Sequence, residues 1–183
     1  QIFHDLNLGV LIFDYRGYGK SKGSPTEKGT YIDAESAWDY LVNVKHIRPE
    51  KIVLFGRSLG SAVAAEVALR RRAGAVILES GFTSVPDLGA KFFPHLPVKL
   101  ISRYHYSSIV KVNRITIPKL FIHSQQDELI PFEQGIRLFE NAAEPKEFLQ
   151  IAGGHNDGFL ISGNAYIAGL DSFISKYLVP PNQ

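Results

Sequence analysis

The stretch that most constrains this chain is Ile52–Gly60, where a short apolar run leads into Gly56-Arg57-Ser58-Leu59-Gly60. The run Ile52 to Phe55 is typical of a buried strand, and residues 61–72, rich in Ala, Val, Leu and Glu, are typical of a helix. Strand, tight turn and helix are the context in which Gly-x-Ser-x-Gly presents a serine hydroxyl above a sheet edge. Because backbone passes close to backbone in such a turn, we expect small residues to be required on both sides of Ser58. The pattern predicts that Ser58 is a nucleophile.

Apolar runs and helical spacings alternate along the rest of the chain. Further strands are predicted at Gly9–Asp14, Ala75–Glu79, Lys119–His123 and Glu147–Ile151. Helices are predicted at Thr26–Val44, Pro131–Ala142 and Asn164–Leu178, with Pro180 and Pro181 ending the last one. This alternation predicts an α/β fold, a mostly parallel sheet with helices on both faces, and residues 1–183 form one domain of ordinary size.

Residues 80–117 interrupt the alternation with prolines and aromatic residues. Two short helices are predicted there, near Val85–Phe93 and Val98–Arg103. A segment of this length between two strands is typical of a lid or cap over the top edge of the sheet. Its apolar residues either line an acyl or other apolar pocket or pack the excursion onto the body.

Two later residues have the types and positions that a serine nucleophile needs. A serine hydroxyl requires a base, usually a histidine oriented by a carboxylate, and in this kind of fold the chain order is serine, acid, histidine. Asp127 lies four residues beyond the predicted strand that ends at His123, and His155 lies four residues beyond the one that ends at Ile151. Because ligands bind at the carboxyl ends of parallel strands, we expect these side chains to meet Ser58.

Other titratable residues compete for these roles. Glu128 is the main rival to Asp127, and Asp157, Asp87 and Glu79 are weaker alternatives. His123 is either a supporting group of the site or a core histidine, and we favour the core. The remaining histidines, which lie in helical or loop stretches, are His4, His46, His95 and His105.

Charge and motif content argue against several other classes of function. The net charge of +2 does not call for a nucleic-acid partner, and Arg70-Arg71-Arg72 closes a helix, where positive charge suits the dipole. The loop Gly19-Lys20-Ser21 lacks the first glycine of a phosphate-binding motif, since Asp14 stands there. With no cysteine and no metal-binding spacing, we expect neither metal nor cofactor. The compartment stays open, with a cytoplasmic or membrane-associated location expected.

These residues together resemble the α/β-hydrolase superfamily, and most closely its branch of acyl-protein thioesterase-like, esterase and peptidase-like serine hydrolases. The matching stretches are Phe13–Ser21, Phe55–Gly60, His123–Pro131 and Gly153–Asp157. The resemblance implies that Ser58 is the nucleophile, His155 the general base and Asp127 its orienting acid. It also implies that the backbone N–H of Leu59 supplies one donor of the oxyanion hole.

One part of the family pattern is not found. Family members carry an earlier strand followed by a His-Gly loop that supplies the second oxyanion donor, and in their sheet this strand lies between the ones matching Gly9–Asp14 and Ile52–Phe55. The chain starts at Gln1 and contains no methionine, so we expect it to be N-terminally incomplete, with any membrane anchor or signal before Gln1. Alternatively, a second copy swapped across a homodimer supplies the strand.

The sequence therefore predicts a serine hydrolase that cleaves an ester, thioester or amide through an acyl-enzyme. We expect a small-molecule or acylated substrate. Loss of one oxyanion donor is worth on the order of 10²–10³ in rate, so this segment alone is expected to be impaired. The alternative is a non-catalytic α/β-hydrolase-fold protein that binds a ligand or partner, or an inactive fragment of a hydrolase.

Overall fold

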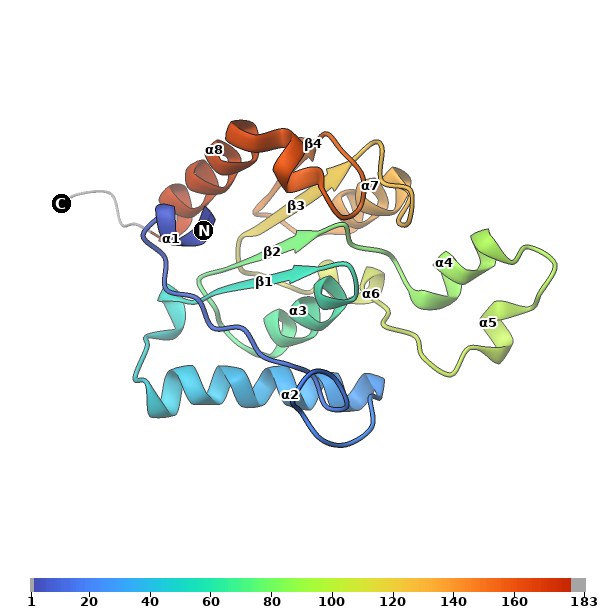
Figure 1. Ribbon diagram of the computed structural model, residues 1–183, viewed down its shortest axis with the longest axis horizontal. Helices are drawn as coiled ribbons and strands as arrows, with labels where there is room; N and C mark the ends of the chain where they lie inside the picture. The colour runs from blue at the N-terminus through green and yellow to red at the C-terminus, as the bar shows by residue number, and fades with distance from the viewer. Residues whose placement is uncertain (1, 179–183) are drawn as a thin grey trace.

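The computed structural model describes residues 2–178, which contain one sheet of four parallel strands (Figure 1). The strands are β1 (Val53–Arg57), β2 (Ala75–Glu79), β3 (Lys119–Ser124) and β4 (Lys146–Ile151), and they lie side by side in chain order. Four of the five predicted strands are thereby confirmed, and their carboxyl ends meet at one edge of the sheet. That edge is where the candidate site residues follow their strands.

Eight helices accompany this sheet in residues 2–178. They are α1 (Ile2–Asp5), α2 (Glu27–Asp39), α3 (Leu59–Arg70), α4 (Val85–Phe92), α5 (Val98–Ile101), α6 (Ile109–Val112), α7 (Phe132–Asn141) and α8 (Gly158–Leu178). A π-helical turn, Tyr40–Val44, continues α2, and a 3₁₀ turn, Pro49–Lys51, precedes β1.

Local chemistry sets several of these helix boundaries. Thr26 caps α2, because its Oγ1 accepts a hydrogen bond from the N–H of Gly29 at 3.0 Å. Helix α8 bends at Gly163, whose φ of 47° lies in the left-handed region, so the helix predicted from residue 164 is its second part. Pro180 and Pro181, predicted to end this helix, lie outside the described residues.

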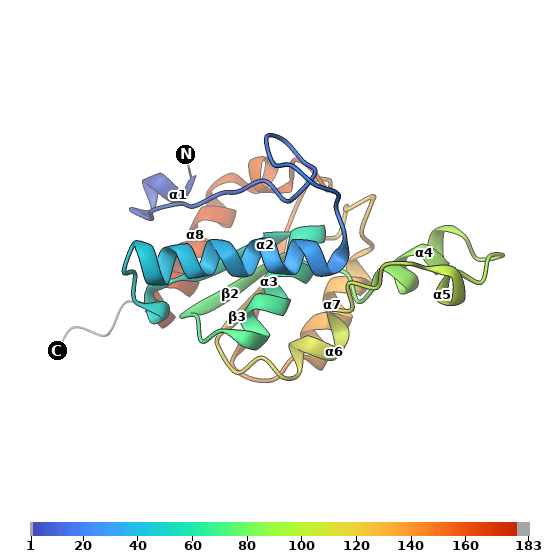
Figure 2. The same cartoon turned by 90° about the horizontal axis from the view of Figure 1, so that it is seen from below.

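Helices cover both faces of the sheet, as predicted (Figures 1 and 2). Strand β2 shows the reason, because its fully buried side chains alternate between two core clusters. Ala75 and Ile77 pack with residues of α8, whereas Val76 and Leu78 pack with residues of α3 and α7. Burying a side chain such as Ile77 or Leu78 contributes roughly 1.5–3 kcal/mol, so β2 links the two layers.

The prediction of a buried strand at Gly9–Asp14 is wrong for this structure. The segment runs extended without forming a strand, and the side chain of Ile12 is 88% exposed. A cavity of about 130 Å³, lined by Leu11, Phe13 and residues of β1, α2 and α3, separates the segment from the sheet. An extended segment becomes a strand only when a neighbour pairs with its backbone. The apolar pattern is present, but β1 is an edge strand here and the ladder partner is missing.

Residues 80–117 form an excursion that leaves the sheet after β2. Two short helices form near the predicted positions, and Figures 1 and 2 show α4 and α5 projecting from the body. Val85 and Leu88 pack against a core cluster that includes Phe82 and Tyr106. Of the two alternatives for its apolar residues, packing onto the body therefore describes the base of the excursion and not its far end.

Candidate active site

Ser58 occupies a strained turn between β1 and α3. Its φ of 53° and ψ of −120° lie outside the regions that a serine ordinarily adopts, and its N–H donates a hydrogen bond to the carbonyl oxygen of Glu79 at 2.9 Å. A Cβ atom on Gly56 would lie 2.1 Å from the carbonyl oxygen of Gly60, which explains why a glycine occupies position 56. A Cβ on Gly60 would meet only the Tyr15 hydroxyl, at 3.8 Å. The expectation of an obligatory small residue on both sides is thus right for Gly56 and wrong for Gly60.

Leu59 is the first residue of α3, directly after Ser58. The first N–H groups of a helix have no acceptor within the helix, and they form its positive end. The Leu59 N–H therefore has the chemistry needed to stabilise a negative charge that develops beside the Ser58 hydroxyl.

Asp127 and His155 come together as the sequence predicts for a base and its orienting acid. Nδ1 of His155 lies 2.8 Å from Oδ2 of Asp127, and both side chains are buried. Burial by itself would raise the pKa of Asp127, but hydrogen bonds from the Ile130 N–H and from His155 outweigh it and lower the pKa. A charged carboxylate at this place fixes the proton of His155 on Nδ1 and leaves Nε2 as a proton acceptor.

Ser58 is linked to His155 through its neighbour Arg57. The side-chain hydrogen bonds found in residues 2–178 join His155 to Asp127 but not to Ser58. Instead, the Arg57 guanidinium donates to the carbonyl oxygen of His155 and, at 3.1 Å, to Oδ1 of Asn156. Sequence reasoning missed Arg57, because the position before the serine is unconstrained in the motif.

The buried carboxylate of Glu79 contacts the side chain of Arg57. Oε1 of Glu79 lies 3.5 Å from Nε of Arg57, and this nitrogen atom has no hydrogen-bond partner. Oε2 of Glu79 accepts a hydrogen bond from the Tyr166 hydroxyl at 2.5 Å. Burial raises the pKa of Glu79, although Tyr166 and Arg57 oppose that shift. Glu79 thus pairs with Arg57 and Tyr166 rather than with a histidine ring. The sequence holds no signal for Tyr166, which lies far along the chain in α8.

The rival acids have other partners. Glu128 accepts a hydrogen bond from the backbone N–H of His155 at 2.9 Å, and Asp157 accepts one from the N–H of Gly154 at 2.6 Å. Asp87 lies in the excursion, where it pairs with Lys99 at 3.0 Å. Glu128 and Asp157 hold the His155 loop, whereas Asp87 joins α4 to α5. Of these four acids, Asp127 alone contacts the imidazole of His155.

His123 is a core residue, as favoured from the sequence. It is 1% exposed, and its Nε2–H donates to the carbonyl oxygen of Ile130 at 2.9 Å. Burial lowers the pKa of His123, so the ring is neutral near pH 7. Its Nε2 also lies 3.6 Å from Oδ2 of Asp127, so the ring packs against the back of the candidate site.

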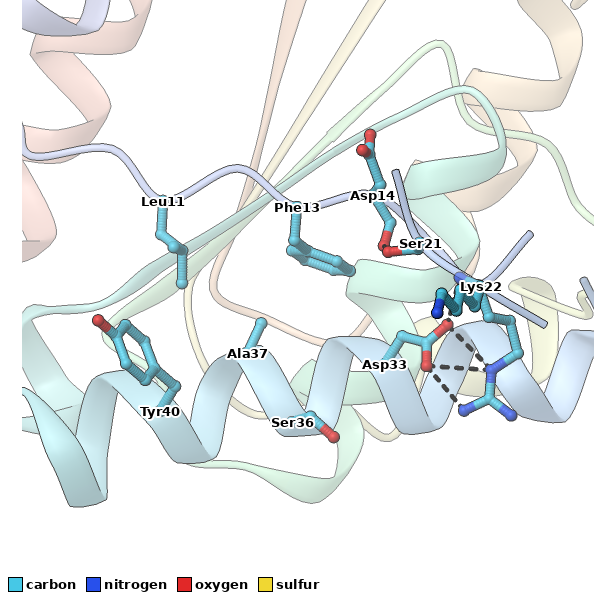
Figure 3. Close-up of a pocket in the computed structure, with 10 residues that line it drawn as sticks. Leu11, Phe13, Asp14, Ser21, Lys22, Asp33, Ser36, Ala37 and Tyr40 are labelled. Carbon is cyan, nitrogen blue, oxygen red and sulfur yellow. Dashed lines mark hydrogen bonds and ion pairs between the residues drawn. The ribbon is translucent and has the colours of Figure 1, made fainter. Parts of the chain in front are cut away.

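A larger cavity lies away from these residues. It measures about 440 Å³ and lies between residues 11–22 and α2 (Figure 3). Arg16 lines this cavity and makes a two-pronged contact with Asp33, whose shortest N–O distance is 2.7 Å. None of the candidate catalytic residues lines this cavity, so it belongs to the exposed N-terminal segment rather than to the Ser58 turn.

No group of three or more His, Asp or Glu side chains in residues 2–178 is arranged to hold a metal ion. The same residues contain no helix that is both long and apolar enough to cross a membrane.

The sequence is similar to a known protein family and to individual proteins of that family. Residues 5–97 match the family model described as alpha/beta hydrolase fold. An uncharacterized protein of Mycobacterium tuberculosis is 38% identical over 177 residues, which are 96% of this chain and 63% of that protein. Alpha/beta hydrolase domain-containing protein 17B of Homo sapiens is 39% identical over 175 residues, 95% of this chain and 59% of that protein. The chain thus spans less than two thirds of the length of these relatives.

Solved structures share the fold at low sequence identity. An esterase of Pyrococcus furiosus superimposes with a TM-score of 0.79 at 19% identity, over 97% of this chain and 73% of the esterase. An acylaminoacyl peptidase of Pyrococcus horikoshii superimposes with a TM-score of 0.66 at 17% identity, over 84% of this chain and 28% of the peptidase. At such identities the likeness shows the fold alone.

Proposed function

Because this chain belongs to the alpha/beta hydrolase fold family, we propose that it is the catalytic part of a serine hydrolase that cleaves an ester, thioester or amide. The observation that carries the proposal is the 2.8 Å contact between Asp127 and His155. It lies at the sheet edge where Ser58 sits on a strained turn before α3. The solved structures of the same fold include an esterase and a peptidase, whose reactions share attack on an acyl carbon.

In the proposed reaction, Oγ of Ser58 attacks the acyl carbonyl carbon while Nε2 of His155 takes the hydroxyl proton. The Leu59 N–H donates to the oxyanion of the tetrahedral intermediate. As the intermediate collapses, His155 gives the proton to the departing alcohol, thiol or amine, and the acyl group stays on Ser58. Water, deprotonated by His155, then attacks the acyl-enzyme and releases the carboxylic acid. Asp127 keeps the imidazole in the required tautomer throughout.

Covalent labelling with a fluorophosphonate probe tests the nucleophile directly. We expect the chain to label on prolonged exposure, at a rate lowered on the order of 10²–10³ by the missing oxyanion donor. Ser58→Ala should be unlabelled, whereas Ser36→Ala, which removes an exposed serine from α2, should label like the wild type. The labelled serine should be identified by mass spectrometry of the modified peptide.

A wild-type chain that is folded but unlabelled would favour the alternative, a non-catalytic protein that binds a ligand through the same fold. That alternative draws support from the hydroxyl of Ser58, whose hydrogen bond to His155 is not formed here. Catalytic hydrogen bonds often tighten only when substrate binds, so labelling separates the two functions better than distance does.

A further inference from the structure

The far end of the excursion exposes several large apolar side chains. We call residues 91–103, which join α4 to α5 and extend past α5, the tip. Five large apolar side chains of the tip face solvent: Phe92, Phe93, Leu96, Leu100 and Ile101. Leu100 is 86% exposed and Ile101 65%. Other apolar side chains are exposed elsewhere, Ile12 and Leu160 among them, but those of the tip gather on one projecting element (Figure 1). A cluster of this kind is typical of an interaction site.

The tip stands away from the rest of the molecule. Two perpendicular views show α4 and α5 projecting beyond the sheet and its covering helices (Figures 1 and 2). The two helices pack on each other, since a Cβ on Gly89 would lie 2.8 Å from Cγ1 of Val98. The apolar side chains of the tip are therefore left uncovered by the described part of the chain.

The charged residues of the tip itself are all basic. Residues 88–106 contain Lys91, Lys99 and Arg103 and no Asp or Glu, a net charge of +3, whereas the whole chain carries +2. The adjacent acid, Asp87, pairs with Lys99 at 3.0 Å and leaves Lys91 and Arg103 as the remaining cations of the tip. Apolar side chains flanked by basic ones match an anionic bilayer surface, which takes the apolar groups among its acyl chains and the cations among its headgroups.

We propose that the tip docks this protein on anionic phospholipid membranes, with Phe93 and Leu100 inserted into the bilayer surface. The excursion leaves the sheet at Ser80, at the carboxyl end of β2, which is the edge that carries Ser58. Docking through the tip therefore turns this edge toward the membrane. Binding requires no bond-making step, so the inference does not depend on the proposed hydrolase reaction.

Sedimentation with vesicles tests the proposal on the full chain. The probe is phosphatidylcholine vesicles with and without phosphatidylserine, each at low and at high salt. One variant, Phe93→Ser with Leu100→Ser, removes apolar contact, and a second, Lys91→Gln with Arg103→Gln, removes charge. A matched control, Val44→Ser with Val110→Ser, changes side chains that are 61% and 58% exposed outside the tip. Thermal unfolding of each variant checks that it is folded.

We expect the wild type and the control to bind phosphatidylserine vesicles alike, and to bind phosphatidylcholine alone and high-salt samples more weakly. The charge variant should lose at least roughly 10-fold in affinity, because two cations near the anionic surface are removed. The apolar variant should also lose at least roughly 10-fold, because membrane binding scales with the apolar area that is buried. Failure of the wild type to sediment with anionic vesicles would overturn the proposal. Equal binding by both tip variants and the wild type would also overturn it, as would equal loss in the control.

Discussion

The guanidinium of Arg57 donates a hydrogen bond to the backbone carbonyl oxygen of His155. The residue before the candidate nucleophile therefore holds the loop that carries the candidate base. Glu79 contacts Arg57 and itself accepts a hydrogen bond from Tyr166, so strands β1 and β2, helix α8 and the His155 loop share one polar network. We expect this network to help fix the position of His155 relative to Ser58.

Replacing Arg57 tests this positioning role. We expect Arg57→Gln to slow fluorophosphonate labelling on the order of 10-fold to 100-fold, because a displaced base loses its alignment with the hydroxyl. Arg57→Lys should recover part of the rate, and Arg48→Gln, which changes an exposed arginine paired with Glu50, should label at the wild-type rate. The rate of labelling of each variant measures the effect, and thermal unfolding checks that each variant is folded. Normal labelling by a folded Arg57→Gln would show that the network is structural only.

Asp127 and Glu128 contact different groups of His155, so their amide variants should differ. Asp127→Asn replaces the acceptor of the Nδ1 proton with an amide and favours the wrong tautomer, and we expect labelling to fall on the order of 10³–10⁴-fold. Glu128→Gln keeps an oxygen for the backbone N–H of His155 and should cost less than about 10-fold, the scale of one hydrogen bond. Equal losses in the two variants would contradict the assignment of Asp127 as the orienting acid.

The two glycines of the turn should respond differently to a methyl group. Gly56→Ala places a Cβ 2.1 Å from the Gly60 carbonyl oxygen, so we expect it to destabilise the fold by about 2 kcal/mol or more. Gly60→Ala meets no close contact and lies in the first turn of α3, where alanine is favoured by up to about 1 kcal/mol. Urea unfolding of both variants measures the difference. Equal destabilisation of the two variants would contradict the close approach of Gly56 to the Gly60 carbonyl oxygen.

The lowered pKa of Lys119 predicts that the free energy of unfolding rises above neutral pH. It is fully buried, its Nζ donates to the carbonyl oxygens of Ile115 and Ile117 at 2.9 Å, and burial lowers its pKa to about 8. Between that value and the usual pKa of about 10.4, the unfolded chain binds a proton that the folded chain does not. The free energy of unfolding should therefore rise with pH there, by at most about 1.4 kcal/mol per pH unit.

Urea unfolding between pH 7 and 10, read as the difference between the wild type and Lys119→Met, isolates this contribution. Burial raises the pKa of Tyr15 to about 12. Above the usual tyrosine pKa of about 10, this shift lowers the free energy of unfolding as the pH rises. The measured pH range therefore ends at about pH 10. Parallel pH curves for the two proteins would mean that Lys119 keeps its proton in the folded state.

Much of the fold could be predicted because its signals are local. Strands β2 and β3 are buried along their whole length, as their apolar runs predict for a parallel sheet covered on both faces. Strands β1 and β4 lie at the edges of the sheet and are mostly half-buried. The run at Gly9–Asp14 carries the same signal and fails, since an apolar pattern records a tendency to be buried while a strand also needs a neighbour with free N–H and C=O groups. Pattern reasoning sees the first condition and not the second.

The sequence by itself determined the residue types and the chain order of Ser58, Asp127 and His155, because each follows its strand at a recognisable turn. Only the tertiary structure decided that Asp127, and not the adjacent Glu128, holds the imidazole. Only the structure brought Arg57, Glu79 and Tyr166 into one network, and only it left the tip of the excursion uncovered. The physical reason is that side-chain pairing and exposure depend on distances between segments far apart in the chain, which no local pattern encodes.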